Sequence, residues 1–340
     1  MSSESHGRLN RHRFQPKRRL DDVATWDLGC TLLERLEQKA EHDSNYVRMQ
    51  HLHLLVELQM ALEPLTSVPD NRFSAACVEQ TFWAIKLAAT RHGLRIRGAH
   101  HVDVGCGSTN PYGRMFAHLL IGVERATCLE LDPVADPARA VRVLADLAAA
   151  VAIDPGRAFG NYTITGRECL ANVADFDLAR MAKGDAGGLS AGRLVYLQRS
   201  IDATGLDAGS VDLAVSNSVL EHVRDPAAAL AELARITRPG GFGIHGIDVS
   251  DHSRFGNPAV HALGFLTVDA AAPIVSESNR LRCCQFEDLF RANGFAILER
   301  FPGPPIQVPP AIRARLQEPW RSMPDCQLAE LWCTYILRRD

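Results

Sequence analysis

A glycine-rich turn near residue 100 has the residue types needed to hold a nucleotide-like ligand. The segment from His101 to Pro111 reads HVDVGCGSTNP, an apolar run that leads into two closely spaced glycines. Gly105 and Gly107 allow the backbone to pass close to a ligand where a side chain would clash. Asp103 precedes the turn, and Cys106 lies inside it, where we expect it to pack as a small hydrophobe rather than to act as a nucleophile.

An acid follows this turn at the distance that a ribose-binding residue would have. Glu130 lies in ATCLEL (residues 126–131), a short apolar strand roughly 20 residues beyond the glycines. A carboxylate at the end of such a strand can accept hydrogen bonds from both hydroxyls of a ribose. The alternative is a solvated carboxylate at a strand end.

Further along the chain, three segments continue the same alternation of strands and helices. LQRSID (197–202) ends a strand at Asp202, SVDLAVSNSVLEHV (210–223) gives another strand and the start of a helix, and AELARITRPGG (231–241) closes a helix. Together with VDVGCGS and LEL, these segments resemble the class I S-adenosylmethionine-dependent methyltransferases, of the type 11-like group. Two departures are Thr109 at the third glycine of the family's turn and Val211 at its usual Phe.

The resemblance implies a fold and a set of cofactor contacts. The fold would be α/β, a Rossmann-like sheet of seven mostly parallel strands with an antiparallel last strand, extended by helices at the N-terminus. S-adenosyl-L-methionine would be the cofactor. Its amino-acid part would lie at the turn, its ribose at Glu130 and its adenine amine at Asp202. The cofactor-binding residues that we expect are Asp103, Gly105, Cys106, Gly107, Glu130, Asp202, Ala203 and Asn217.

The acceptor side is predicted at the carboxyl end of the strand FGIHGIDV (242–249). Ligands bind at that edge of an open α/β sheet. His245, Asp248, Asp251 and His252 lie on or just past this strand. Asp251 and His252 could pair to remove a proton from a hydroxyl, so they are our predicted catalytic residues.

Other assignments for these residues stay open. A metal site built from the same four residues is an alternative, although we expect no metal because no complete ligand set is visible. Simple capping of the strand is another. His222 and Asp248 are predicted to bind the acceptor. Arg280, in the segment NRLR (279–282), would hold an anionic group of the acceptor or form a surface ion pair.

The expected activity is O-methylation of a small molecule or a sugar or glycan acceptor. N- or S-methylation of a small metabolite is one alternative, and a non-catalytic S-adenosylmethionine-binding protein is another. A nicotinamide-linked dehydrogenase would need a small residue at Asn110 and would have no RPGG run. Nothing in the sequence favours other chemistry at such a site, such as aminopropyl transfer.

The composition fits an ordinary globular enzyme. Of 340 residues, 46% are hydrophobic and 23% charged, and the formal charge of −3 gives no general attraction to nucleic acid or membrane. We find no stretch long enough to span a membrane and no secretory leader. Nine cysteines lie without metal-ligand spacing, which favours reduced thiols and a cytoplasmic location.

Three regions are expected along the chain. Residues 1–20 form a basic, disordered arm, and residues 21–95 form helices that cap the active site or make a homodimer contact. The methyltransferase domain would occupy residues 96–340, with insertions at 153–192 and 302–330.

Overall fold

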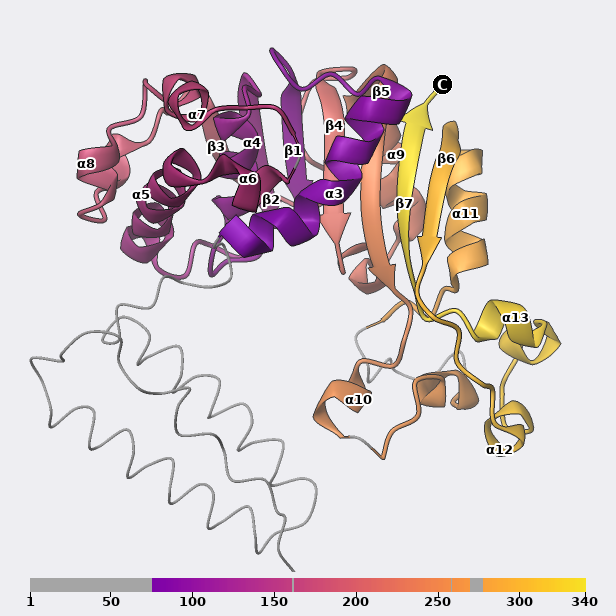
Figure 1. Ribbon diagram of the computed structural model, residues 1–340. Coiled ribbons are helices and arrows are strands. Elements are labelled where there is room, and N and C mark those ends of the chain that lie inside the picture. Colours follow the sequence, from indigo (N-terminus) through magenta and orange to yellow (C-terminus); the bar gives the residue numbers. More distant parts are fainter. Residues whose placement is uncertain (1–74, 161, 258, 270–277) are drawn as a thin grey trace, which may run out of the picture. The chain divides into compact units, whose positions relative to one another are not determined.

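Seven strands form a single sheet in the order β3-β2-β1-β4-β5-β7-β6 (Figure 1). The computed structural model describes residues 75–340 apart from 161, 258 and 270–277. The sheet belongs to a compact unit formed by Arg72–Arg254 and Val260–Asp340. The strands are β1 (His100–Val104), β2 (Arg125–Glu130), β3 (Leu194–Gln198), β4 (Val211–Asn217), β5 (Thr237–Asp248), β6 (Phe295–Pro302) and β7 (Trp332–Arg339).

The strand directions confirm the predicted fold class. Strands β1 to β5 pair in parallel, and β7 runs antiparallel to both β5 and β6. Parallel strands place their carboxyl ends at one edge of the sheet. The residues that follow β1, β2, β3, β4 and β5 therefore gather along a common edge.

Helices cover both faces of the sheet. One apolar cluster joins α3 (Ala75–His92), α4 (Gly113–Leu120) and α5 (Pro137–Ile153) to side chains of β2, β4 and β5. The other joins α9 (Pro226–Ile236) and α11 (Cys283–Ala292) to side chains of β1, β4 and β5. Side chains of β1 alternate between the two layers, as a strand buried on both faces requires.

Shorter helices lie in the connections. Between α5 and β3 the chain forms α6 (Pro155–Phe159), α7 (Gly166–Asn172), α8 (Leu178–Met181) and the 3₁₀ turn η3 (Ala186–Gly188). Between β4 and α9 lies η4 (Leu220–His222), and beyond β5 lie α10 (Ser253–Gly256) and η5 (Gly264–Thr267). Between β6 and β7 are α12 (Pro310–Arg313), η6 (Trp320–Ser322) and α13 (Asp325–Leu328).

Two predicted boundaries are wrong. β3 ends at Gln198, so Asp202 lies in the turn after the strand rather than at its tip. Glu221 and His222 belong to η4 and not to the following helix. That helix starts later because Pro226 fits only its first turn and Asp225 caps it, its Oδ1 accepting the N–H of Ala228 at 3.0 Å.

Asp212 shows how the amino end of the sheet is held. Its carboxylate accepts the backbone N–H of His100 at 2.8 Å and pairs with Arg95 at 2.8 Å and Arg238 at 2.6 Å. These contacts give Asp212 a structural role, because this end of β4 is opposite to the carboxyl edge of the sheet.

Within the described part of the chain, no helix combines the length and apolarity needed to cross a bilayer. The predicted basic arm and residues 21–74 of the predicted helical region lie outside the described residues. The described part of that region contains α3 (Ala75–His92).

Candidate active site

The predicted glycine turn connects β1 to α4 and has the backbone conformation that it needs. Gly105 has φ +66° and Gly107 has φ +78°, a region that favours glycine. A Cβ atom on Gly105 would lie 2.4 Å from Cγ2 of Val219, whereas one on Gly107 would meet nothing within 4 Å. The turn is therefore tightly packed at Gly105 and open at Gly107.

Glu130 touches this turn directly. Its Oε2 accepts the backbone N–H of Gly107 at 2.8 Å, and its Oε1 accepts the N–H of Leu131 at 2.8 Å. The carboxylate is half-buried at the end of β2. The glycine turn and the predicted ribose acid thus form one structure, as the sequence spacing indicated.

Two residues beside this turn, Leu131 and Asn110, have no sequence signal of a role in binding. Leu131 keeps 65% of its surface exposed, and it follows Glu130 directly, where an apolar side chain can cover one face of a purine. Asn110 is only 5% exposed, and neither polar atom of its side chain has a hydrogen-bond partner among the described residues. A buried amide without a partner is costly, which indicates that a ligand completes its hydrogen bonds.

The remaining cofactor candidates lie on the same edge. Asp202 and Ala203 are exposed after β3, and Asn217 is exposed at the end of β4. Cys106 is half-buried in the turn. Ser218, which follows Asn217, has φ +53°, so the chain turns sharply where β4 ends.

Asp103 is placed differently from the others, since it lies inside the protein. Its Oδ1 accepts from Nη1 of Arg114 at 2.6 Å, and both side chains are largely buried. Burial raises the pKa of this carboxyl to about 6, although the neighbouring Arg114 opposes that shift. Asp103 therefore fixes the position of Arg114 from beneath the turn.

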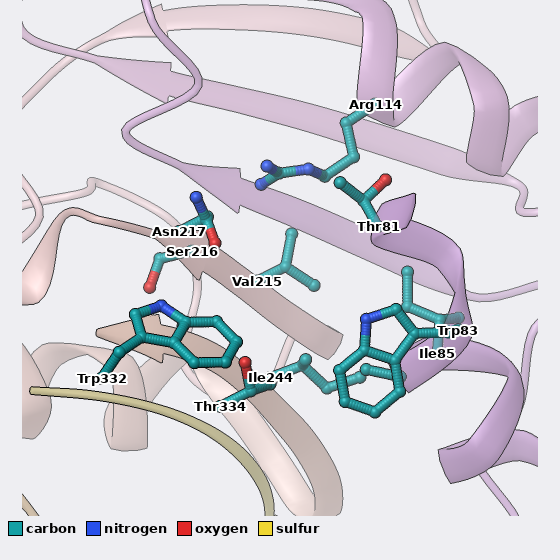
Figure 2. Close-up of a pocket in the computed structure, with 12 residues that line it drawn as sticks. Thr81, Trp83, Ile85, Arg114, Val215, Ser216, Asn217, Ile244, Trp332 and Thr334 are labelled. Atoms are coloured by element: carbon teal, nitrogen blue, oxygen red, sulfur yellow. The ribbon is translucent and has the colours of Figure 1, made fainter. Parts of the chain in front are cut away.

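Arg114 links the turn to a pocket beside it (Figure 2). The pocket has a volume of about 140 Å³ and is open to solvent. Figure 2 shows the indole rings of Trp83 and Trp332 on two sides of the hollow, with Val215 and Ile244 between them. Side chains from α3, α4, β4, β5 and β7 line it. They are Thr81, Trp83, Ala84, Ile85, Arg114, Val215, Ser216, Asn217, Ile244, Trp332 and Thr334, with Gly246 in the floor.

A group of acids and histidines lies where β4 and β5 end. Glu221 is fully buried, and its Oε1 accepts the N–H of Asp248 at 3.1 Å. Burial raises the pKa of Glu221 to about 7. The ring centroids of His222 and His252 are 4.7 Å apart. Burial lowers the pKa of His252, and the neighbouring His222 lowers it further.

The predicted pairing of Asp251 with His252 is corrected by the structure. The carboxylate of Asp248 lies beside His252, with 3.9 Å between Oδ1 and the imidazole Nε2. Asp251 is buried, and its Oδ1 accepts the N–H of Ser253 at 3.0 Å. The loop bends directly after β5, so the carboxylate of Asp251 closes a local turn instead of holding the imidazole.

Three residues from the segments singled out in the sequence lie inside the protein and outside the pocket lining. Arg280 is 4% exposed and donates from Nη1 to the carbonyl of Asp269 at 2.9 Å. Arg282 is fully buried and donates to the carbonyls of Val249, Leu328 and Glu330. His245, also buried, bonds Ser216 Oγ through Nδ1 at 2.8 Å.

Comparisons with known proteins match parts of this chain. Residues 153–244 match the family model described as a methyltransferase domain. A 37.1 kDa uncharacterized protein in transposon TN4556 of Streptomyces fradiae is 58% identical over 36 residues, which are 11% of this chain and 10% of that protein.

Solved structures give matches of low identity. An S-adenosylmethionine-dependent methyltransferase from Mesorhizobium loti is 16% identical, with 76% of this chain and 97% of that chain covered and a TM-score of 0.39. An arsenic(III) S-adenosylmethionine methyltransferase from Chlamydomonas reinhardtii is 17% identical, with 72% of this chain and 64% of that chain covered and a TM-score of 0.38.

The matched domain segment, the sheet order with its antiparallel β7, and the glycine turn joined to Glu130 agree with one another. The chain therefore has a Rossmann-like fold, and its residues 153–244 match a methyltransferase domain.

Proposed function

We propose that this protein transfers the methyl group of S-adenosylmethionine to an oxygen atom of a small-molecule or sugar acceptor. The observation that carries the proposal is the Asp103–Arg114 ion pair of 2.6 Å. Asp103 stands two residues before Gly105, and Arg114 lines the pocket. The cofactor turn and the pocket are therefore neighbours, as transfer between two bound molecules requires.

The residues at the turn fit S-adenosylmethionine. Glu130 offers a carboxylate to the ribose hydroxyls, Leu131 an apolar surface to the adenine, and Asp202 an acceptor to its amine. The open backbone at Gly107 and the unpartnered amide of Asn110 suit the amino-acid part. When bound, the cofactor supplies an electrophilic methyl carbon on a sulfonium, open to in-line attack.

The chain's own contribution is to position the acceptor and to handle its proton. Trp83 and Trp332 give the pocket flat apolar walls that exclude water from an acceptor. A hydroxyl must lose its proton as its oxygen bonds to carbon, and the group formed by Glu221, His222, Asp248 and His252 has the acids and imidazoles for that task. An amine or thioether acceptor would need this group less.

Titration of the full chain with S-adenosylmethionine in a calorimeter tests the cofactor site. Glu130→Gln should weaken binding by roughly 10- to 100-fold, because a charge-assisted hydrogen bond contributes about 1.5 to 3 kcal/mol. The matched control is Glu124→Gln, which changes an exposed carboxylate just before the other end of β2 and should bind like the wild type. Equal binding by the Glu130 variant would remove Glu130 from the site.

Turnover to S-adenosylhomocysteine over a panel of acceptors tests the reaction. We expect product with hydroxyl compounds and a lower rate for His252→Ala by about 10²-fold or more. Product with amines or thiols alone would identify N- or S-methylation instead. Cofactor binding without turnover on any acceptor would indicate a non-catalytic binding protein.

A further inference from the structure

Three metal-ligating side chains come together at the carboxyl edge of β4 and β5. The ligand atoms of Glu221, His222 and His252 all lie within 4.8 Å of one another. Glu221 and His222 come from η4, directly after β4, and His252 follows β5 by four residues. Because β4 and β5 pair in parallel, with Ser216 opposite His245, their ends deliver these residues to one place.

Glu221 supplies a second, independent observation. It has no exposed surface, and its Oε2 has no hydrogen-bond partner among the described residues. Its other oxygen is occupied by the N–H of Asp248 at 3.1 Å. A buried carboxylate oxygen is costly to leave unpaired, and a cation held also by the two imidazoles would satisfy it.

We propose that Glu221, His222 and His252 bind a divalent transition-metal ion of the Zn²⁺ type. Two imidazoles and one carboxylate form a ligand set that suits such ions and leaves a position open, whereas Mg²⁺ and Ca²⁺ prefer oxygen alone. Ligand atoms about 2.0 to 2.2 Å from one ion lie up to roughly 4.4 Å apart, so small side-chain rotations close the site. Asp248, with its Oδ1 3.9 Å from His252 Nε2, lies beside it as a further carboxylate.

For methyl transfer this site has a definite use, and this part of the inference rests on the proposed function. An acceptor hydroxyl at the open position would have its pKa lowered, and it would lose its proton before attack on the methyl carbon. His252 would then act as a ligand instead of as the base. Asp248, beside the site, could take up that proton and pass it to water.

Metal binding is measured on the full chain without acceptor or cofactor. After treatment with a chelator, the protein is titrated with Zn²⁺ in a calorimeter and with Co²⁺ in the visible spectrum. We expect one site whose affinity falls at least tenfold in His222→Gln, His252→Gln and Glu221→Gln, since even changes outside the ligand shell cost about 10- to 100-fold. His222 is exposed, so its variant should keep the fold, which thermal unfolding checks.

The matched control is His92→Gln, because His92 pairs with Glu299 on another element and belongs to no metal cluster among the residues that the structure describes. It should bind Zn²⁺ like the wild type. The absence of a site, or unchanged affinity in a folded His222→Gln, would overturn the inference. Titration of the same samples with S-adenosylmethionine tests the proposed function separately, so the failure of one proposal is not mistaken for failure of the other.

Discussion

At the scale of single residues, sequence patterns located the groups whose chemistry follows from local geometry. Gly105, Gly107 and Glu130 form one hydrogen-bonded structure, with Gly107 N–H at 2.8 Å from the carboxylate. The spacing of glycines and acid predicts this because a parallel βαβ unit brings consecutive strand ends together. Asn110 and Leu131 could not be identified in the same way, because an unpaired amide and an exposed leucine are recognised only once burial is known.

The glycine turn gives a prediction about stability. Gly105→Ala should lower the free energy of unfolding by about 3 kcal/mol, since it combines a positive φ with overpacking against Val219. Gly107→Ala has the same backbone strain but no clash and should cost about 1 kcal/mol. Urea denaturation measures both. Adding Val219→Ala should recover part of the loss in the first variant alone, and equal losses in the two glycine variants would contradict the packing argument.

At the scale of elements, the structure changes which residues work together. The sequence predicted that Asp251 would pair with His252. In the structure the chain bends after β5, and Asp248 Oδ1 lies 3.9 Å from the Nε2 atom of His252. It also placed Glu221 and His222 in a helix, whereas they form η4 ahead of α9. Both differences arise in connections, where a shift of one or two residues reverses the direction of a side chain. The ion pair between Asp103 of β1 and Arg114 of α4 likewise forms only because β1 and α4 pack together.

Removing the Asp103–Arg114 ion pair tests how much it contributes to the free energy of unfolding. Arg114→Met should destabilise the protein by about 3 kcal/mol at pH 7.5, because it leaves the buried carboxylate of Asp103 unpaired. The pKa of Asp103 is already raised to about 6, and loss of Arg114 raises it further. An acid with a raised folded-state pKa favours folding at low pH, so the deficit should shrink at pH 5.5. Thermal unfolding at the two pH values measures this.

The control for this experiment replaces the pair by apolar groups. Arg114→Met combined with Asp103→Leu should regain most of the stability at pH 7.5, since the desolvated charge is gone. A double variant as unstable as the single one would show that the ion pair is not the cause.

At the scale of the whole molecule, the interior holds histidines that fold as neutral groups. Burial lowers the pKa of His101 and His245 to about 4, and it lowers that of His118 well below the ordinary value. A base whose pKa is depressed by folding contributes full stability above its unfolded pKa of about 6.5. That contribution is lost as the pH falls toward 4, because the unfolded chain takes up protons first. These histidines therefore make the fold less stable in mild acid, whereas the raised pKa of Asp103 acts in the opposite direction.

His245→Gln should reduce this sensitivity. Between pH 7 and pH 5 a buried histidine of pKa 4 costs about 2 kcal/mol of folding free energy, and glutamine cannot titrate. Denaturant unfolding at pH 7 and at pH 5 measures the change in the free energy of unfolding for each variant. Ser216→Ala removes the hydrogen-bond partner of His245 and keeps the imidazole. This variant should therefore lose as much unfolding free energy between pH 7 and pH 5 as the wild type does. An equal change in the free energy of unfolding between pH 7 and pH 5 in the wild type and in His245→Gln would contradict the prediction.

The sequence by itself determined the elements and their order, because hydrophobic periodicity, helix caps and glycines act over a few residues. The parallel strands with an antiparallel β7 were expected from the family resemblance of the motifs, and the spacing of the glycines and the acid predicted the meeting of the glycine turn with Glu130. Only the tertiary structure decided the rest. It buries Arg280, places Asp248 beside His252, and brings Glu221, His222 and His252 together. These outcomes depend on where loops bend and which side chains lose water, and both are set by contacts between residues far apart in the chain.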